Sequence, residues 1–303
     1  MGETEGRRIV GTPALPGGQY GAGRAWVLLA PGFLALALTF VAPLLLFGAY
    51  AFARGGLFTV TWDFTLDNFV TVLTDPFVGL LIVRSLITGF IVAGICLVIA
   101  LPLAFYLRFR AGRLETPLFV LLVVALFVSY LARIYAWRAL FTSSGVFTVL
   151  IESLGVTEPP QLLFTRTLVV IALVHIYLPF VTLAIYAAMR NLPRTVLEVA
   201  EDLGATGLMS WRRVILPLMA STSLAPFMFT LGLAASDFAT PQLLGGTKGT
   251  LVGVLVQQQF AEAGNFPMGA AMSLVLLVVF VLLYFALTSL LFATRLHRVS
   301  VRL

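Results

Sequence analysis

Residues 79–107 read GLLIVRSLITGFIVAGICLVIALPLAFYL, with Arg84 as the one charged side chain. An α-helix needs roughly 20 apolar residues to cross the hydrocarbon layer of a membrane, which is about 30 Å thick. The apolar residues form a continuous run that does not alternate with polar ones, which favours a helix over a strand of a membrane barrel. The stretch therefore predicts a transmembrane helix.

Five further runs of the chain meet the same length requirement. They are residues 26–52, 118–137, 167–189, 218–237 and 268–292. The composition agrees, because 60% of the residues are hydrophobic and 11% are charged, with a mean hydropathy of +1.04. Soluble domains are usually about 45–50% apolar and about 25% charged. We therefore predict an all-α, polytopic membrane protein with six transmembrane helices.

The domain organisation follows from these runs. Residues 1–25 are rich in Gly and Pro and are interpreted as a flexible cytoplasmic tail, residues 26–296 as the six-span domain, and residues 297–303 as a second cytoplasmic tail. The apolar run after the first tail is too long for the core of a signal peptide, which is about 7–15 residues. Cys96 lies inside a span and is interpreted as a small buried apolar side chain.

The basic residues set the orientation. With both termini inside, thirteen of the nineteen Lys and Arg residues fall in cytoplasmic segments. Two lie within spans, and four fall outside: Arg54, Arg138, Arg166 and Lys248. This asymmetry follows the positive-inside rule. The pI near 9.9 is thus explained by topology, and no nucleic-acid partner is implied.

The cytoplasmic loop at residues 191–217 has the pattern of an ordered structure. Thr195 stands three residues before Glu198, which is the spacing of a capping box, and Gly204 is placed to end the helix. Apolar residues recur at helical spacing and predict one apolar face, made of Val196, Val199, Ala200 and Leu203. A helix this short is marginal alone in water, so we expect it to pack on the membrane domain or in a groove of a soluble partner.

The loop also carries a recognisable motif. Glu198-Val199-Ala200, three residues, Gly204, nine residues and then Val214-Ile215-Leu216-Pro217 resemble the EAA signature of ABC-importer permeases, with Val at 199 and 214 as conservative departures. Other segments resemble the B-type permease subunit of spermidine/putrescine importers, within the MetI-like family of binding-protein-dependent permeases. They are Tyr130 to Trp137, Leu178-Pro179-Phe180, Ser236-Asp237-Phe238, Leu243 to Gly246 and Gln257 to Phe260.

The resemblance implies a type I ABC importer in a bacterial inner membrane. Its partners would be two cytoplasmic ATPase subunits, a second permease that is a non-identical homologue, and an external substrate-binding protein. The EAA helix would be the coupling helix that sits in a groove of the ATPase. The residues that the match assigns to coupling are Glu198, Ala200, Leu203 and Gly204, with Arg212 and Arg213 either docking on the ATPase or serving topology alone.

The chain lacks the residues of an enzyme. No Gly-x-x-x-x-Gly-Lys-Ser/Thr phosphate loop occurs, and Gly245 to Thr250 departs from it both before and after Lys248. The two histidines, His175 and His297, have no zinc-ligand spacing and belong to no Ser/His/Asp set. We therefore predict no catalytic residues, no metal and no cofactor on this chain, with ATP and Mg bound by the partner subunit.

Polar residues in the outer half of the spans are candidates for the substrate pathway, because ionisable groups in membranes usually face a bundle interior or an aqueous path. Asp237 could meet an ammonium group, with Tyr135 and Trp137 offering aromatic faces. A purely structural salt bridge between Arg133 and Asp237 is an equal alternative. Gln257 lies where a segment between spans could line an outer gate.

These observations predict a permease that moves a small organic cation, with polyamines favoured by resemblance, by alternating access. Permeases of the same framework for other amines, amino-acid derivatives or anions remain alternatives. A secondary transporter would need coupling carboxylates deep in the membrane, and the spans offer almost none.

Overall fold

The computed structural model describes residues 22–56, 58–156, 160–193 and 195–293. The chain divides into two compact units, Met1–Ala49 and Tyr50–Leu303, which are described separately. The described residues are overwhelmingly helical, which confirms the predicted fold class, and they contain one short hairpin that the sequence did not predict. Most of the two predicted tails lies outside the described residues.

The first unit is a nearly uninterrupted helix. It comprises α1 (Ala22–Leu36), the π-helical turn η1 (Ala37–Val41) and most of α2 (Ala42–Tyr50). The predicted first span corresponds to Leu29–Tyr50, a helix long and apolar enough to cross a membrane. Its large side chains, such as Leu38, Phe40 and Leu45, are exposed, as expected of a helix that meets lipid or a partner subunit.

Three long helices form the centre of the second unit. α4 (Pro76–Phe105) packs against both α8 (Arg166–Arg190) and α11 (Leu216–Ser236). Small residues permit close helix contact in membranes. Gly89 of α4 is such a site, because a Cβ there would lie 2.7 Å from the Leu231 carbonyl oxygen of α11. Cys96 is fully buried in this core and unbridged, as predicted.

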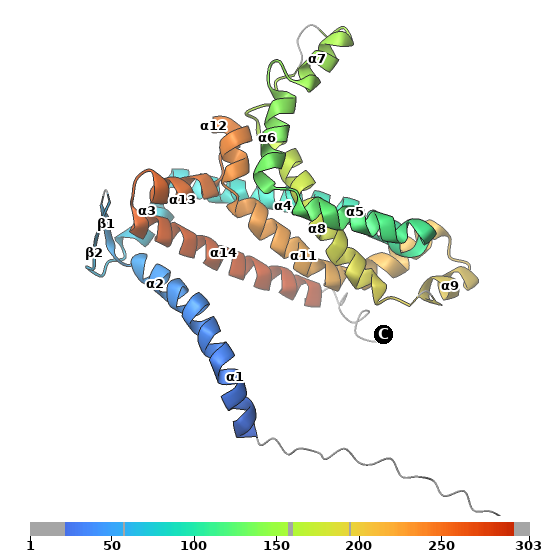
Figure 1. Ribbon diagram of the computed structural model, residues 1–303, viewed down its shortest axis with the longest axis horizontal. Coiled ribbons are helices and arrows are strands. Elements are labelled where there is room, and N and C mark those ends of the chain that lie inside the picture. The colour runs from blue at the N-terminus through green and yellow to red at the C-terminus, as the bar shows by residue number, and fades with distance from the viewer. Residues whose placement is uncertain (1–21, 57, 157–159, 194, 294–303) are drawn as a thin grey trace, which may run out of the picture. The chain divides into compact units, whose positions relative to one another are not determined.

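The two ends of this bundle carry different structures (Figure 1). At one end lie α3 (Asp67–Thr74), α13 (Val252–Ala261), the start of α14 (Phe266–Ala293) and the antiparallel hairpin of β1 (Arg54–Gly56) and β2 (Thr59–Thr61). At the opposite end lies α9 (Thr195–Asp202). The remaining short elements are η2 (Tyr106–Arg110), η3 (Gly112–Leu114), α10 (Gly207–Ser210), η4 (Trp211–Ile215), η5 (Pro241–Gly245) and α12 (Gly246–Gly249).

Six helices of the described residues are long and apolar enough to cross a membrane, as predicted. Five match most of their predicted ranges, with shifted ends. They are Leu29–Tyr50, Pro76–Arg110, Arg166–Arg190, Gly207–Ser236 and Phe266–Leu290. The third is Tyr130–Ser153, which shares only residues 130–137 with its predicted range of 118–137.

The third span differs because the chain breaks inside the predicted range. α5 (Glu115–Phe127) ends where Val128 and Ser129 adopt extended backbone angles, and α6 (Tyr130–Phe141) then runs in a new direction, followed by α7 (Val146–Ser153) (Figure 1). The 13 residues of α5 rise only about 20 Å at 1.5 Å per residue, too little to cross the membrane alone. A single straight helix over 118–137 was therefore wrong.

Candidate functional site

The predicted helix in the loop between the fourth and fifth spans is present as α9. Thr195 is the first helical residue of α9, whereas a capping residue stands one position before the helix begins. The helix ends as predicted at Gly204, whose φ of +81° favours glycine. The Ala205 N–H donates to the Ala200 carbonyl and the Gly204 N–H to the Glu201 carbonyl, both at 2.9 Å, which is the Schellman pattern of helix termination.

The apolar stripe predicted for α9 is only partly buried. Ala200 is buried, and Leu197 packs against the hydrophobic core. Val199 and Leu203 are instead 55% and 83% exposed. One turn of a helix separates these two residues, so they form a single outward patch. The helix is thus held to the membrane domain by one face and presents a second apolar face to the exterior.

A cavity of about 530 Å³ lies between α9 and the neighbouring helix ends. Glu198 and Glu201 line it from α9, and Phe105, Phe109 and Trp211 line it from the helices opposite. Glu198, assigned to coupling by the motif, therefore stands at the rim of this cavity. Arg212 and Arg213 are exposed on η4 at the same end of the bundle, so the structure groups the predicted coupling residues.

Asp237 directly follows α11 and is only 8% exposed as a residue, and its carboxylate is closely hydrogen-bonded. Its Oδ2 accepts from the Tyr130 hydroxyl at 2.5 Å and from the Thr240 hydroxyl at 2.7 Å. Its Oδ1 accepts from the Ala239 backbone N–H at 3.0 Å. The sequence assigned no role to Tyr130 or Thr240. The spacing of Asp237 and Thr240, typical of a helix N-terminus, could have revealed the second contact.

Arg133 does not pair with Asp237 in the described chain, so the predicted salt bridge is wrong. The Arg133 guanidinium, 9% exposed as a residue, donates to the carbonyls of Ile176 at 3.1 Å, Val128 at 2.9 Å and Ala125. Carbonyls at the end of a helix lack intrahelical partners. Arg133 thus satisfies the carbonyls that the break after α5 leaves open, which explains how this break persists in an apolar setting.

The two aromatic candidates on α6 have surroundings of their own. Trp137 donates from Nε1 to His175 Nδ1 at 3.2 Å and stacks on Phe141. Tyr135 lies on an exposed face of α6. Among the described residues, no hydrogen bond or ring contact joins either aromatic side chain to Asp237, so the structure does not show the predicted group around one ammonium.

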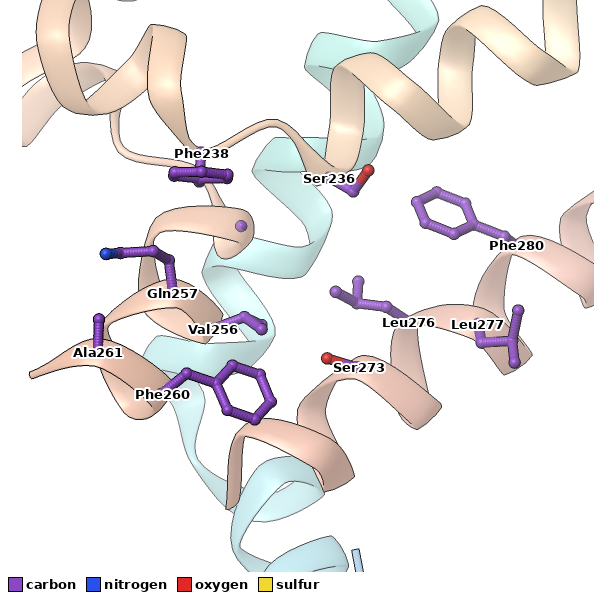
Figure 2. A pocket seen from close by; sticks show the side chains of 11 residues that line it. Ser236, Phe238, Val256, Gln257, Phe260, Ala261, Ser273, Leu276, Leu277 and Phe280 are labelled. Atoms are coloured by element: carbon purple, nitrogen blue, oxygen red, sulfur yellow. The ribbon is translucent and has the colours of Figure 1, made fainter. Parts of the chain in front are cut away.

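Gln257 lines a cavity of about 490 Å³ between α11, α13 and α14. Figure 2 shows Val256, Gln257 and Phe260 of α13 on one side and Ser273, Leu276 and Phe280 of α14 on the other, with Ser236 and Phe238 above them. The cavity is mainly apolar with three phenylalanine rings. Gln257 Oε1 is buried and has no hydrogen-bond partner among the described residues. This oxygen has almost no accessible surface, so a molecule in the cavity would reach it only after the side chain moves.

Long apolar helices, with a short helix anchored beyond one end and a cavity near the other, define a multi-span membrane protein. The family described as "Binding-protein-dependent transport system inner membrane component" matches residues 98–298, and the chain belongs to this family. It is therefore a multi-pass inner-membrane component of a transport system.

Curated relatives agree over most of the chain. The spermidine/putrescine transport system permease protein PotB of Escherichia coli K12 is 32% identical over 249 residues, which cover 82% of this chain and 90% of that protein. PotB of Haemophilus influenzae is 31% identical, with coverage of 86% and 88%. The inner membrane ABC transporter permease protein YdcU of E. coli is 30% identical, with coverage of 90% and 94%.

Solved structures show the same fold. A chain of a bacterial ABC transporter involved in the import of the acidic polysaccharide alginate superposes with a TM-score of 0.69 at 16% identity, covering 88% of this chain and 96% of the other. A second structure is that transporter in complex with an alginate pentasaccharide-bound periplasmic protein, with a TM-score of 0.66 at 15% identity and coverage of 86% and 91%.

Proposed function

We propose that this chain is one of two permease subunits of a type I ABC importer for spermidine, putrescine or a related small organic cation. Its partners are two cytoplasmic ATPase subunits, a second, non-identical permease and an external substrate-binding protein. ATP and Mg bind to the ATPase subunits and not to this chain. Both termini lie in the cytoplasm, which places α9 on the same side, in accord with the distribution of arginines.

The observation that carries the proposal is the double-faced packing of α9. Leu197 and Ala200 hold the helix to the membrane domain, while Val199 and Leu203 form an apolar patch on its outer side. Partners with a hydrophobic groove bind helices through apolar anchors spaced by about one turn. A helix held on one face and bound on the other can transmit closure of the ATPase to the membrane helices.

The relatives support an amine as cargo, and so does the cavity between α11, α13 and α14, called here the outer cavity. Two of the relatives described above are named for spermidine and putrescine transport. A polyamine combines an aliphatic chain with ammonium groups, and the cavity offers apolar walls and aromatic rings. Ammonium groups are attracted to aromatic faces.

The coupling proposal is tested with Leu203→Glu, which places a charge in the apolar patch. The control is Leu66→Glu, an equally drastic change at an exposed leucine at the opposite end of the second unit. Burying an unpaired carboxylate in a groove is costly, so we expect ATPase binding to weaken by about a hundredfold or more.

The measurement is the amount of ATPase subunit that co-purifies with the tagged chain from membranes, together with stimulated ATP hydrolysis. Loss of both with Leu203→Glu and retention with Leu66→Glu is the expected result. Full ATPase recovery with Leu203→Glu would overturn the assignment of α9 as the coupling helix.

A further inference from the structure

A small polar pocket lies at the end of the bundle that carries α9. It has a volume of about 310 Å³ and is lined by Glu115, Thr116 and Phe119 at the start of α5 and by Tyr186 and Arg190 at the end of α8. Arg190 is the last residue of a helix long and apolar enough to cross a membrane, so we expect the pocket where a bilayer meets water. Neither the coupling helix nor the outer cavity contributes to it.

The pocket contains two opposite charges that do not neutralise each other. No ion pair joins Glu115 to Arg190 in the part of the chain that the structure describes. The Tyr186 hydroxyl donates to Glu115 Oε1 at 2.6 Å, and Tyr186 is itself only 5% exposed. The carboxylate is therefore held in a fixed direction, while the Arg190 side chain is exposed at the rim. Such an arrangement suits a ligand with a cation and an anion a short distance apart.

The surroundings indicate a lipid. The outer face of α5 exposes Val120, Leu121 and Val124 directly beyond the pocket. Arginines at 108, 110 and 113 lie on the adjoining turns, at a level expected of a membrane surface. Basic pockets between transmembrane helices bind lipid head groups. The apolar face of α5 would then accompany the acyl chains.

We propose that this pocket binds the head group of a zwitterionic aminophospholipid, with the ammonium on Glu115 and the phosphate on Arg190. An ethanolamine head group carries these two charges on neighbouring groups. An anionic phosphatidylglycerol would satisfy Arg190 but would leave the Glu115 carboxylate without a cation and close to a like charge. The acidic residue thus selects against anionic lipids at a surface whose other charges attract them.

The test is native mass spectrometry of the purified full-length chain after exchange into mixed micelles with equal amounts of phosphatidylethanolamine and phosphatidylglycerol. The wild type should retain phosphatidylethanolamine about tenfold better, the effect expected of one additional charge-assisted hydrogen bond. E115Q should retain the two lipids about equally, and R190Q should retain neither. R113Q, which removes a neighbouring arginine that does not line the pocket, should behave as the wild type.

The thermal midpoint of each variant reports whether it folds. If E115Q does not fold, Y186F replaces it, because this change keeps both charges but releases the carboxylate, and the lipid preference should then fall. Equal retention of the two lipids by the wild type would overturn the proposal. An unchanged lipid preference in folded E115Q, or in Y186F where it replaces E115Q, would also overturn it. Occupation of the site by a second protein subunit that excludes both lipids would overturn it as well.

Discussion

Gly89 offers a quantitative test of how α4 packs against α11. A Cβ at this position would lie 2.7 Å from the Leu231 carbonyl oxygen and 3.0 Å from the Ala235 Cβ. The first distance is too short for carbon and oxygen, and one of the partners is backbone, so the helices themselves must move. Gly94 lies on the same helix, and a Cβ there would meet nothing within 4 Å.

The pair Gly89→Ala and Gly94→Ala isolates the packing cost. Each change gains about 0.8–1 kcal/mol of helix propensity, which cancels when the two variants are compared. Overpacking costs about 1–3 kcal/mol, so Gly89→Ala should be less stable than Gly94→Ala by about 2 kcal/mol. At about 2–4 °C per kcal/mol, the thermal midpoint of Gly89→Ala should be about 4–8 °C lower.

The assay is the fraction of chain that stays monodisperse in mild detergent after heating, measured for both variants and the wild type. Gly94→Ala should equal or exceed the wild type, because nothing opposes its gain in helix propensity. Equal midpoints for the two variants would refute the close contact between α4 and α11.

Two further predictions concern the buried polar residues Arg133 and Asp237. Arg133→Gln leaves the carbonyls of Ala125 and Val128 without their donor, and at about 1–3 kcal/mol for each unsatisfied group the thermal midpoint should fall by several degrees. An unchanged midpoint would contradict the role of Arg133 in stabilising the break after α5. Asp237→Asn weakens the charge-assisted hydrogen bonds from Tyr130 and Thr240, so the thermal stability should fall. The apparent KM for a transported amine should stay within about twofold. A large rise in KM with unchanged stability would show that the carboxylate contacts cargo.

Much of the fold could be predicted because apolar length and helical periodicity are local signals. Five spans and the ending of α9 at Gly204 follow from residues next to one another in the chain. The break at Val128 and Ser129 could not be found in this way, because those residues interrupt no apolar run. It depends on Arg133, whose side chain reaches back to the freed carbonyls.

The candidate site was harder to predict than the fold. Ala200 is buried and its neighbour Val199 is exposed. Both side chains are apolar, so apolarity alone does not tell which of them is buried. The contact between Tyr130 and Asp237 joins residues 107 positions apart, and no local spacing reveals it. The charges of Arg133 and Asp237 suggested a salt bridge, yet each is satisfied by uncharged groups.

The most direct test of the proposed function is ATP-driven uptake of labelled spermidine into proteoliposomes that contain this chain with its co-purified subunits and binding protein. We expect uptake that requires ATP, is inhibited by excess putrescine but not by an alginate oligosaccharide, and is abolished by Leu203→Glu. Spermidine uptake that proceeds without ATP, or that persists at the wild-type rate with Leu203→Glu, would contradict it.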